Sequence, residues 1–451
     1  MSERVFTIFG AGLAGALLAA RLGRGGHRVD LYERRPDPRV GGAERGRSIN
    51  LALSARGLEA LASVGLREAA LAMAIPMRGR MMHSRDGALA YQRYSPSGED
   101  AINSISRGGL NAALLDAAER CPAVRIFFGQ RCLGVDFARR EAEVLDVGGG
   151  GVRRVAWRTL IGADGAFSAV RGAMQRLDRF DFEQAYLTHA YKELTIPPNP
   201  DGSHRIEKHA LHIWPRRSFM MIALPNLDGS FTCTLFAPFE GPDGIAGLRD
   251  DGAVLGYFRE RFADAAALMP TLAEDFRANP AASLVTMRCF PWRVGGEAAL
   301  VGDAAHAVVP FYGQGMNASF EDCVVLGDCI DRRGEDLEAA FAEYESLRKP
   351  NTDALAQLAL DNFVEMRDKV GDPAFLARKR REQRLARWFP RWYVPLYSMV
   401  SFSTIPYAEA VRRAGRQDDA VRLAVGVALA VLIPAGLAGA LMLARWMGGV
   451  G

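Results

Sequence analysis

The chain has 451 residues, of which 49% are apolar and 24% are charged. This length allows two or three domains of about 150 residues each. The composition is that of an ordinary folded protein, which excludes disordered, collagen-like and coiled-coil chains. The formal net charge is +4, from 56 basic and 52 acidic residues, so no strongly basic field indicates nucleic-acid binding.

The cysteines give no sign of a disulfide framework or of a metal site. None forms a Cys-x-x-Cys pair, and none stands at a zinc-type spacing to a histidine. We predict no metal and interpret them as small buried residues in a reducing compartment. The six are Cys121, Cys132, Cys233, Cys289, Cys323 and Cys329.

The first part of the chain predicts a βαβ unit. An apolar run at 4–10 is followed by a glycine turn, a helix to about Leu22 and a second strand at 27–33. The chain enters this first strand without a charged leader, which argues against Sec-type secretion and favours a cytoplasmic location. Farther on we predict helices over 50–66 and 107–120, and further strands of the same sheet over 124–129 and 159–165.

The pattern changes after about residue 180. Short apolar runs predict strands over 191–196, 211–215, 219–225 and 230–239. In the last run threonines alternate with apolar residues, which indicates a half-exposed antiparallel sheet. A helical stretch to about Met269 follows. The nucleotide-binding pattern then returns, so we predict that a sheet domain interrupts the first domain, with helices from about residue 336 onward.

A glycine motif follows the first strand. It is Gly10-Ala11-Gly12-Leu13-Ala14-Gly15. In a dinucleotide-binding turn Gly10 permits the tight turn, Gly12 lets the backbone approach a pyrophosphate, and Gly15 lets the helix lie close to the strand. Glu33 ends the second strand, where a carboxylate accepts hydrogen bonds from a ribose, which favours FAD or NAD over NADP at this site.

Two further turns carry an aspartate. Asp164 lies in GADGAFSAVR (162–171), and Asp303 lies in GDAAH (302–306), which continues through Pro310 to FYGQGMN (311–317). A buried strand that ends in Gly-Asp places one carboxylate where a helix begins, within reach of a sugar-chain hydroxyl. The alternative is that both aspartates are only helix caps.

The three motifs, in this order, resemble those of the FAD-dependent aromatic hydroxylases. Within that family, longer strings are similar to those of the kynurenine 3-monooxygenases, and they cover the chain from about residue 5 to 410. They include RSINLALSARG (47–57), PMRGRMMHS (76–84), YKELTIPP (191–198), LHIWPR (211–216), SFTCTLFAPF (230–239), DNFVEMRD (361–368) and VPLYSMVSFSTIPY (394–407).

The resemblance implies an α/β fold in which a mainly antiparallel sheet interrupts an FAD-binding Rossmann-like domain and a helical region follows. The implied boundaries are 1–180 for the first part of the FAD-binding domain, with an inserted substrate-contacting segment around 70–106, then 181–290 for the sheet domain, 291–335 for the second part of the FAD-binding domain, 336–422 for the helical region and 423–445 for an apolar tail.

The resemblance also implies an activity. A flavin monooxygenase of this kind converts L-kynurenine, NADPH and dioxygen into 3-hydroxykynurenine, NADP and water, within tryptophan degradation toward NAD biosynthesis. FAD would be tightly bound. Because the chain has one dinucleotide fingerprint, NADPH would be a transient co-substrate without a domain of its own.

The family pattern implies four substrate-binding residues. Arg80 would pair with the carboxylate of the amino acid, because a guanidinium can bind it bidentately and stays charged. Tyr94 would add a hydroxyl, with Tyr91 as its rival, and Arg78 is the rival of Arg80. Further hydrogen bonds would come from the helical region, through Asn362 and Tyr397.

The resemblance implies a larger set for the cofactor. Phe311 and Tyr312 would shield the flavin ring, whereas we interpret His306 as a structural turn residue. The FAD contacts would be Gly10, Gly12, Ala14, Gly15, Glu33, Arg34, Arg35, Ala52, Arg107, Cys132, Asp164, Asp303, Gly315, Met316 and Asn317.

One segment near the C-terminus indicates membrane contact. Residues 423–444 carry no charge and follow a group of arginines; as a helix they would be about 33 Å long, close to the thickness of the hydrocarbon core. The alternative is a tail helix that packs on the protein or on a second copy. If the segment spans a membrane, the preceding arginines keep the main domain in the cytoplasm.

Other functions stay open from the residues alone, because one fold hosts many activities. The first is a related FAD-dependent hydroxylase that acts on another aromatic or a quinone-type substrate. A second is a flavoprotein that does not hydroxylate, such as a membrane-linked isoprenoid-chain reductase. A third is a flavin-binding regulatory protein without turnover.

Overall fold

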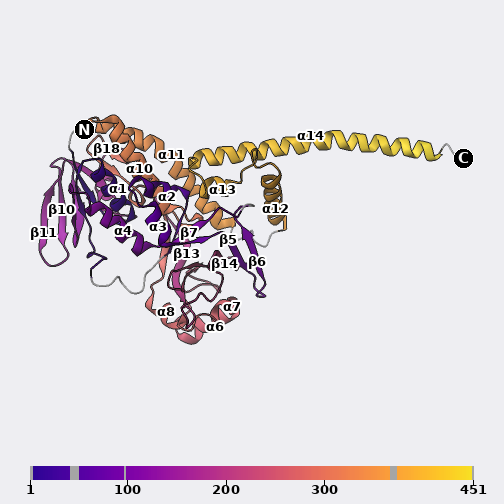
Figure 1. Ribbon diagram of the computed structural model, residues 1–451, viewed down its shortest axis with the longest axis horizontal. Helices are drawn as coiled ribbons and strands as arrows, with labels where there is room; N and C mark the ends of the chain where they lie inside the picture. The colour runs from indigo at the N-terminus through magenta and orange to yellow at the C-terminus, as the bar shows by residue number, and fades with distance from the viewer. Residues whose placement is uncertain (1–3, 41–49, 96–97, 366–372, 449–451) are drawn as a thin grey trace.

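The structure is a computed structural model (Figure 1). It describes residues 4–40, 50–95, 98–365 and 373–448, without the side chains of 373–376, 379, 383, 429 and 431–448.

The first sheet has six strands, in the order β18-β19-β12-β1-β2-β8. All neighbours pair in parallel except β18 with β19, which pair antiparallel. The predicted βαβ unit is confirmed, and the strands come from both ends of the predicted FAD-binding domain. They are β1 (Val5–Phe9), β2 (Arg28–Tyr32), β8 (Val124–Phe127), β12 (Thr159–Gly162), β18 (Arg293–Val294) and β19 (Ala298–Leu300).

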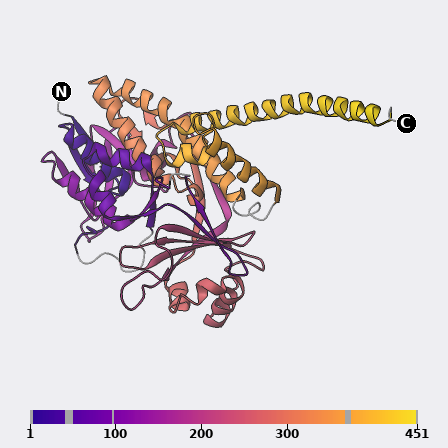
Figure 2. The same cartoon turned by 45° about the vertical axis from the view of Figure 1, so that its right-hand side comes forward.

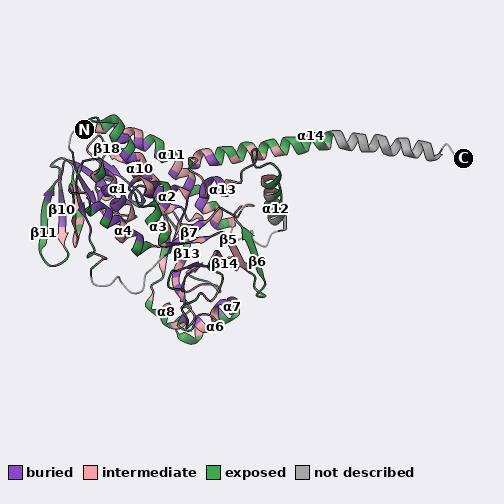
Figure 3. Cartoon of the chain, in the orientation of Figure 1, coloured by how far each residue is buried: buried purple, intermediate pink, exposed green. Residues whose placement is uncertain are grey.

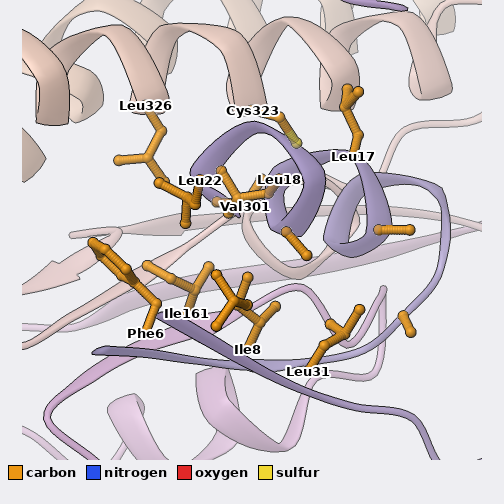
Figure 4. Close-up of a cluster of buried hydrophobic side chains, with 14 of the residues drawn as sticks. Phe6, Ile8, Leu17, Leu18, Leu22, Leu31, Ile161, Val301, Cys323 and Leu326 are labelled. Carbon is orange, nitrogen blue, oxygen red and sulfur yellow. The ribbon is translucent and has the colours of Figure 1, made fainter. Parts of the chain in front are cut away.

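Helix α1 (Leu13–Arg24) packs between this sheet and α10 (Gly315–Arg333), and beside α4 (Arg107–Glu119). The residues from Gly15 to Ala20 are all buried, because the helix has neighbours on several sides. Figure 4 shows the resulting core, in which side chains of β1, α1 and α10 meet. Burial of apolar area at about 25 cal/mol per Å² is the main force that holds these layers together.

The second sheet has seven strands, in the order β17-β13-β16-β15-β14-β5-β6. The predicted alternation is confirmed: Phe231, Cys233 and Leu235 are fully buried, whereas Thr232 and Thr234 are only half-buried. The strands are β5 (Gly79–His83), β6 (Leu89–Arg93), β13 (Asp181–Ile196), β14 (Ala210–Pro215), β15 (Met220–Pro225), β16 (Phe231–Pro238) and β17 (Ala282–Phe290).

Three short helices cover one face of this sheet (Figure 2). They are α6 (Asp251–Arg261), α7 (Ala263–Ala266) and α8 (Leu272–Ala278), and together with the sheet they form a second apolar core. The opposite face of the sheet is turned toward the first domain and lines the cavity described below. The sequence does not reveal that β5 and β6, from the segment around 70–106, extend this sheet.

Two three-stranded sheets complete the β structure. The first contains β3 (Asn50–Leu53), β4 (Ala74–Met77) and β7 (Ile102–Ser106), and the second contains β9 (Gln130–Asp136), β10 (Glu141–Asp146) and β11 (Gly151–Ala156). The predicted helix over 50–66 is wrong at its start. Residues 50–53 pair with β7 instead, and α2 (Ala55–Ser63) begins after Ser54; α3 (Arg67–Ala72) follows.

The chain ends in helices, as predicted. Short elements α5 (Ala169–Met174), α9 (Asp303–His306) and the 3-10 turn η1 (Pro310–Tyr312) precede the long α11 (Leu337–Val364). The remaining helices are α12 (Pro373–Trp388), α13 (Leu396–Ser401) and α14 (Tyr407–Gly448).

Helix α14 starts against α11 and α13 and then leaves the body of the protein (Figure 3). Leu423, Val425 and Val427 are exposed on it. Within the described part of the chain, no helix combines the length and the apolar character needed to cross a membrane. Most side chains of the predicted tail, residues 423–445, lie outside the described part of the chain.

Candidate active site

A cavity of about 830 Å³ lies between the two large sheets. One wall consists of the turns that follow β1, β2, β12 and β19, so it lies at the carboxyl ends of the parallel strands. The other wall is the inner face of the seven-stranded sheet, with residues of β13 to β16 and Arg80 of β5. Carboxyl ends of parallel strands are the usual location of ligand sites in such sheets.

The glycine turn has the geometry that its motif requires. Gly10 has a φ of +99°, and a Cβ on it would lie 2.3 Å from the carbonyl oxygen of Ala163. A Cβ on Gly15 would lie 1.8 Å from the carbonyl oxygen of Gly10. A Cβ on Gly12 would meet no atom within 4 Å, so the space beside this residue is open to the cavity.

Glu33 is buried at the end of β2 and braces this turn. Its Oε2 accepts a hydrogen bond from the backbone N–H of Ala11 at 2.9 Å. Its Oε1 accepts from the backbone N–H and from Nε of Arg35, at 3.1 and 3.0 Å. Arg34 and Arg35 also line the cavity.

The two aspartates differ in their partners. Asp164 Oδ2 accepts from the backbone N–H groups of Ala169 and Val170, at 2.7 and 3.3 Å, whereas its buried Oδ1 has no partner. Asp164 is thus partly a helix cap. Asp303 lines the cavity, and its carboxylate has no hydrogen-bond partner in the described part of the chain. Burial raises the pKa of both carboxyl groups, which favours ligands that donate hydrogen bonds to them.

The opposite end of the cavity holds a cation between two phenols. The Cζ of Arg80 lies 4.3 Å from the centre of the Tyr397 ring and 5.8 Å from that of Tyr94. Burial lowers the pKa of Arg80, but the phenol oxygens of Tyr397 and Tyr94 outweigh it, so the pKa stays above its ordinary value. The Nε of Arg80 and the hydroxyl of Tyr94 are buried without a hydrogen-bond partner.

No described carboxylate forms an ion pair with Arg80. A guanidinium that stays charged in a desolvated place without an acid is costly unless an anion joins it. The rivals named from the sequence lie elsewhere: Arg78 and Tyr91 are both exposed. The geometry therefore favours Arg80 as the group that receives an anionic part of a ligand.

The sheet face between these two ends is mostly apolar. Leu211 and Ile213 of β14, with Ile222 of β15, line it together with Phe236 of β16. The face also carries polar residues, among them Glu193 and Thr234, which are register partners on β13 and β16. Such a surface suits a flat aromatic ligand with a polar group at one end.

An aromatic turn closes the cavity beside this face. Phe311 packs against Phe236 and Phe363, with ring centres 4.9 and 4.4 Å apart. Asn362 donates from Nδ2 to the carbonyl oxygen of Phe311 at 2.6 Å. Tyr312 lies 5.7 Å from Tyr397, centre to centre, so the turn touches the phenols around Arg80.

Comparisons with known proteins agree with this geometry. A model of the FAD binding domain family matches residues 3–359. Kynurenine 3-monooxygenase of Myxococcus xanthus is 50% identical over 92% of this chain and 89% of its own length, and that of Salinispora tropica is 47% identical over 96% of both. The chain belongs to the kynurenine 3-monooxygenase family. A eukaryotic member, from Dictyostelium discoideum, is 45% identical over 90% of both chains.

Solved structures show the same fold at low identity. The tetrameric form of 2-methyl-3-hydroxypyridine-5-carboxylic acid oxygenase has a TM-score of 0.67 at 20% identity, over 83% of this chain and 96% of its own. Pseudomonas aeruginosa PqsL in complex with 2-aminobenzoylacetate has a TM-score of 0.66 at 20% identity, over 83% and 100%. The predicted fold class, a flavin-hydroxylase α/β fold with a helical C-terminus, is confirmed.

The cavity wall of this kynurenine 3-monooxygenase family member contains most of the residues predicted from the sequence. Those in the wall are Gly10, Gly12, Ala14, Glu33, Arg34, Arg35, Ala52, Arg80, Arg107, Cys132, Asp164, Asp303, Phe311, Tyr312, Gly315, Met316 and Tyr397. Burial raises the pKa of the Cys132 thiol to about 12, which keeps it neutral and leaves its backbone as the polar group.

Four predicted residues lie behind the wall rather than in it. Gly15 packs on the glycine turn, and Tyr94 stands behind Arg80. Asn362 holds the Phe311 turn. Asn317 is fully buried: its Oδ1 accepts from the backbone N–H of Ser54, and its Nδ2 donates to the carbonyl oxygens of Ala52 and Gly313. Direct ligand contacts by these four residues remain predictions.

The cavity fits FAD in its chemistry. The N-terminus of α1, a helix of 12 residues, has no side-chain cap and no acidic residue in its first turn, so its N–H groups are available to a pyrophosphate. The bare side of Gly12 leaves room for that group, and Asp303 offers an unpaired carboxylate to hydroxyls of a sugar chain.

Sequence reasoning missed the network that supports the Gly-Asp turn. Asp322 of α10 accepts at Oδ2 from the backbone N–H of Gly302 at 3.1 Å and lies 2.5 Å from Nε2 of His306. Its Oδ1 accepts from Nε of Arg348 at 2.6 Å. His306 is buried in this network, as expected for a structural residue. An acid within a helix gives no sequence signal for such a distant partner.

Proposed function

We propose that this protein hydroxylates L-kynurenine to 3-hydroxykynurenine, with FAD as bound cofactor and NADPH and dioxygen as co-substrates. Family membership supports the reaction type, and one observation in the structure supports the substrate class. That observation is Arg80, a cation in the cavity wall with two tyrosines around it and no ion-pair partner among the residues that the structure describes. An aromatic amino acid supplies the missing carboxylate.

The cavity suggests how the substrate lies. With its carboxylate on Arg80 and hydrogen bonds from the hydroxyls of Tyr397 and Tyr94, the aniline ring would lie on the apolar face formed by Leu211, Ile213 and Ile222. A guanidinium attracts a carboxylate by its charge and also orients it, because the two groups can form two parallel hydrogen bonds. The carboxylate thus serves as the handle that sets which ring carbon is presented for hydroxylation.

For the cofactor we propose that Gly12 and the start of α1 hold the pyrophosphate, that Glu33 accepts from the ribose and that Asp303 accepts from the ribityl chain. Arg107, at the start of α4, would add a cation beside the pyrophosphate. Held by these residues, FAD would supply the redox chemistry of the reaction: reduction by NADPH and activation of dioxygen for hydroxylation of the aromatic ring.

The residues of the chain must also exclude water from that chemistry. Phe311, Phe236 and Phe363 form an apolar plug beside the cavity, and Asn362 keeps the turn in place through the Phe311 carbonyl oxygen. Burial raises the pKa of Tyr312 well above its ordinary value, so this ring stays neutral. A dry site favours oxygen transfer over loss of peroxide to solvent.

The test is NADPH consumption by the FAD-loaded protein with and without L-kynurenine, with the product identified by mass. We expect L-kynurenine to accelerate NADPH consumption, and the product to gain one oxygen atom that derives from labelled dioxygen. Absence of labelled product, or equal NADPH consumption without kynurenine, contradicts the proposal.

The alternative is a related hydroxylase with a quinone-type or other non-carboxylate substrate. Such a substrate would leave Arg80 without a partner, so replacement of Arg80 by methionine would barely change turnover. A flavoprotein that does not hydroxylate would oxidise NADPH without incorporating labelled oxygen. The observed position of Arg80 favours the amino acid.

We also propose the domain division predicted from the sequence: residues 1–180 and 291–335 bind FAD, 181–290 with the segment around 70–106 bind substrate, and 336–422 form the helical region. The separate apolar cores of the two sheets support this division.

For the tail, residues 423–445, we propose membrane contact that keeps the flavin domain on the cytoplasmic side. Exposed apolar residues at the start of this segment support it. Fractionation of the full chain and of a chain ending at residue 422 tests the idea: the longer form alone should sediment with membranes, and soluble recovery of both contradicts it.

A further inference from the structure

Arg56 is a buried arginine for which the FAD and kynurenine sites provide no role. It lies in α2, within the string RSINLALSARG, and it is 2% exposed. It is not in the cavity wall. Removing a guanidinium from water costs free energy unless it gains hydrogen bonds or an ion pair. The partners of Arg56 therefore indicate which parts of the protein it connects.

The partners of Arg56 belong to the C-terminal segment. Its Nε donates to the carbonyl oxygen of Val400 at 3.2 Å, and its Nη2 donates to that of Ile405. Its Cζ lies 4.0 Å from the centre of the Tyr407 ring. Val400 lies in the last turn of α13, Ile405 in the link that follows, and Tyr407 at the start of α14. All three are about 350 residues away from Arg56 along the chain.

Two of these contacts satisfy backbone groups that would otherwise be orphaned. Val400 lies in the last turn of α13, a helix of six residues, and Ile405 lies in the irregular link to α14. Carbonyl groups at helix ends and in links lack helical partners. The guanidinium of Arg56 donates hydrogen bonds to both carbonyl groups at once. Because α13 is short, these charged hydrogen bonds are important for holding it in position.

The same short helix carries Tyr397. It lies three positions before Val400, and the centre of its ring is 4.3 Å from the Cζ of Arg80. Tyr397 also contacts Tyr94, Tyr312 and Phe402. Any movement of α13 therefore moves a wall of the place where we propose that the substrate carboxylate binds.

The other side of Arg56 is anchored in the FAD-binding domain. Its Nη1 donates to Oε1 of Glu321 at 3.0 Å, and Oε2 of Glu321 accepts from Nη1 of Arg348 at 2.6 Å. Arg348 in turn binds Asp322, which holds the Gly302 turn. Tyr407 adds a second tie, from its hydroxyl to Oε1 of Gln314 at 3.1 Å.

We propose that Arg56 is a positioning residue for the substrate carboxylate: it fastens α13 to the FAD-binding domain and so holds Tyr397 against Arg80. This inference rests on the proposed function, because it assumes that a carboxylate binds at Arg80. It assigns Arg56 no contact with substrate or FAD. Replacement of Arg56 should therefore raise the KM only for substrates that carry the carboxylate.

The experiment compares L-kynurenine with its decarboxylated analogue, which keeps the ring and the ketone. In Arg56→Met we expect the KM for L-kynurenine to rise about tenfold to a hundredfold, because a small misplacement of a binding group costs that much. The KM for the analogue should change less than about threefold relative to the wild type, and so should the affinity for FAD. Arg56→Lys should recover part of the loss, since it keeps a charge on Glu321 but lacks the planar fork.

Two controls make the result decisive. Arg67→Met removes an exposed arginine that pairs with Glu59 and should leave both KM values unchanged. The double variant Arg56→Met with Tyr397→Phe should lose less than the sum of the single losses, because both act on one group. Equal rises in KM for both substrates, or additive losses, overturn the proposal. If Arg56→Met does not fold, Arg56→Lys is judged by the same ratio of KM values.

The wild-type protein separates the two proposals. If it shows no kynurenine-dependent NADPH consumption, the proposed function fails and the role of Arg56 fails with it. If it does, and Arg56→Met keeps the wild-type preference for kynurenine over its analogue, only the role of Arg56 fails.

Discussion

The guanidinium of Arg80 lies against the ring of Tyr397, with 4.3 Å between Cζ and the ring centre, although the two residues are 317 positions apart. One belongs to the seven-stranded sheet and the other to the C-terminal helices. The proposed substrate site is therefore complete only when the helical region is docked on the sheet. This arrangement places the proposed carboxylate site at the junction between the sheet and the C-terminal helices.

Replacement of Arg80 by methionine should raise the KM for L-kynurenine by about a hundredfold or more, since loss of a buried charge partner costs roughly 2–5 kcal/mol. Initial rates of NADPH consumption at varied kynurenine concentration measure this effect. Arg78→Met, which removes an exposed arginine two residues away, is the matched control and should behave like the wild type. An unchanged KM for L-kynurenine in this variant would mean that Arg80 does not bind the carboxylate of the substrate.

The glycine turn offers a test that separates cofactor binding from folding. In Gly12→Ala the new Cβ points into open cavity space, so the apoprotein should keep its Tm while the affinity for FAD falls about tenfold or more, because the methyl occupies the pyrophosphate position. In Gly15→Ala the new Cβ would meet the Gly10 carbonyl oxygen at 1.8 Å, so the Tm of the apoprotein should fall as well.

Flavin fluorescence titrations and thermal melts of the apoproteins check both glycine variants. The prediction is that Gly12→Ala lowers only the affinity for FAD, whereas Gly15→Ala also lowers the Tm of the apoprotein. If Gly12→Ala binds FAD as tightly as the wild type, the pyrophosphate does not lie beside Gly12.

Asp303→Asn should weaken FAD binding by about tenfold, because hydrogen bonds to a charged acceptor contribute roughly 1.5–3 kcal/mol. The carboxylate has no partner in the described part of the chain, so the folded protein should not lose stability. Equilibrium dialysis against FAD measures the affinity, and Asp178→Asn, a change at an exposed pair with Arg179, serves as control. Unchanged affinity would place the ribityl chain elsewhere.

Much of the fold could be predicted from local patterns. The unit β1-α1-β2 was predicted because a buried strand, a glycine turn and an apolar helix leave clear periodicities, and β16 because threonine alternates with apolar residues. The start of the helix over 50–66 was predicted wrongly. Residues 50–53 form a strand since β7 pairs with them, and a four-residue pairing leaves too short a pattern to compete with helical periodicity.

The site residues divide along similar lines. Gly12, Glu33 and Asp303 lie in motifs whose spacing carries their chemistry, so they could be named in advance. Arg56 could not, because its partners Val400 and Ile405 contribute backbone oxygens, and no sequence pattern records a contact with a carbonyl group so far along the chain. For the same reason, the contact of Asp322 with the backbone of the Gly302 turn could not be predicted from the sequence.

The sheet that carries Arg80 also contains a histidine that should make stability depend on pH. His212 is buried on β14; its Nδ1 lies 2.8 Å from Nε2 of His83, and its Nε2 lies 2.8 Å from the carbonyl oxygen of Glu207. The outer nitrogen of His83 faces Asp264. Burial lowers the pKa of His212 to about 4 from its ordinary value of 6.5.

The sign of the effect follows from proton uptake. Between pH 6.5 and about 4 the unfolded chain binds a proton at His212 that the folded protein does not, so the free energy of unfolding falls as the pH falls through this window. The loss of stability begins near pH 6.5, is complete below about pH 4, and amounts to roughly 3 kcal/mol. Thermal melts at pH 7.5, 6 and 5 should show a steady decline in Tm. In His212→Gln the part of the decline due to this residue should disappear, whereas His209→Gln, on the same segment, should decline like the wild type. An identical pH dependence in His212→Gln and the wild type would mean that His212 takes up its proton in the folded protein as readily as in the unfolded chain.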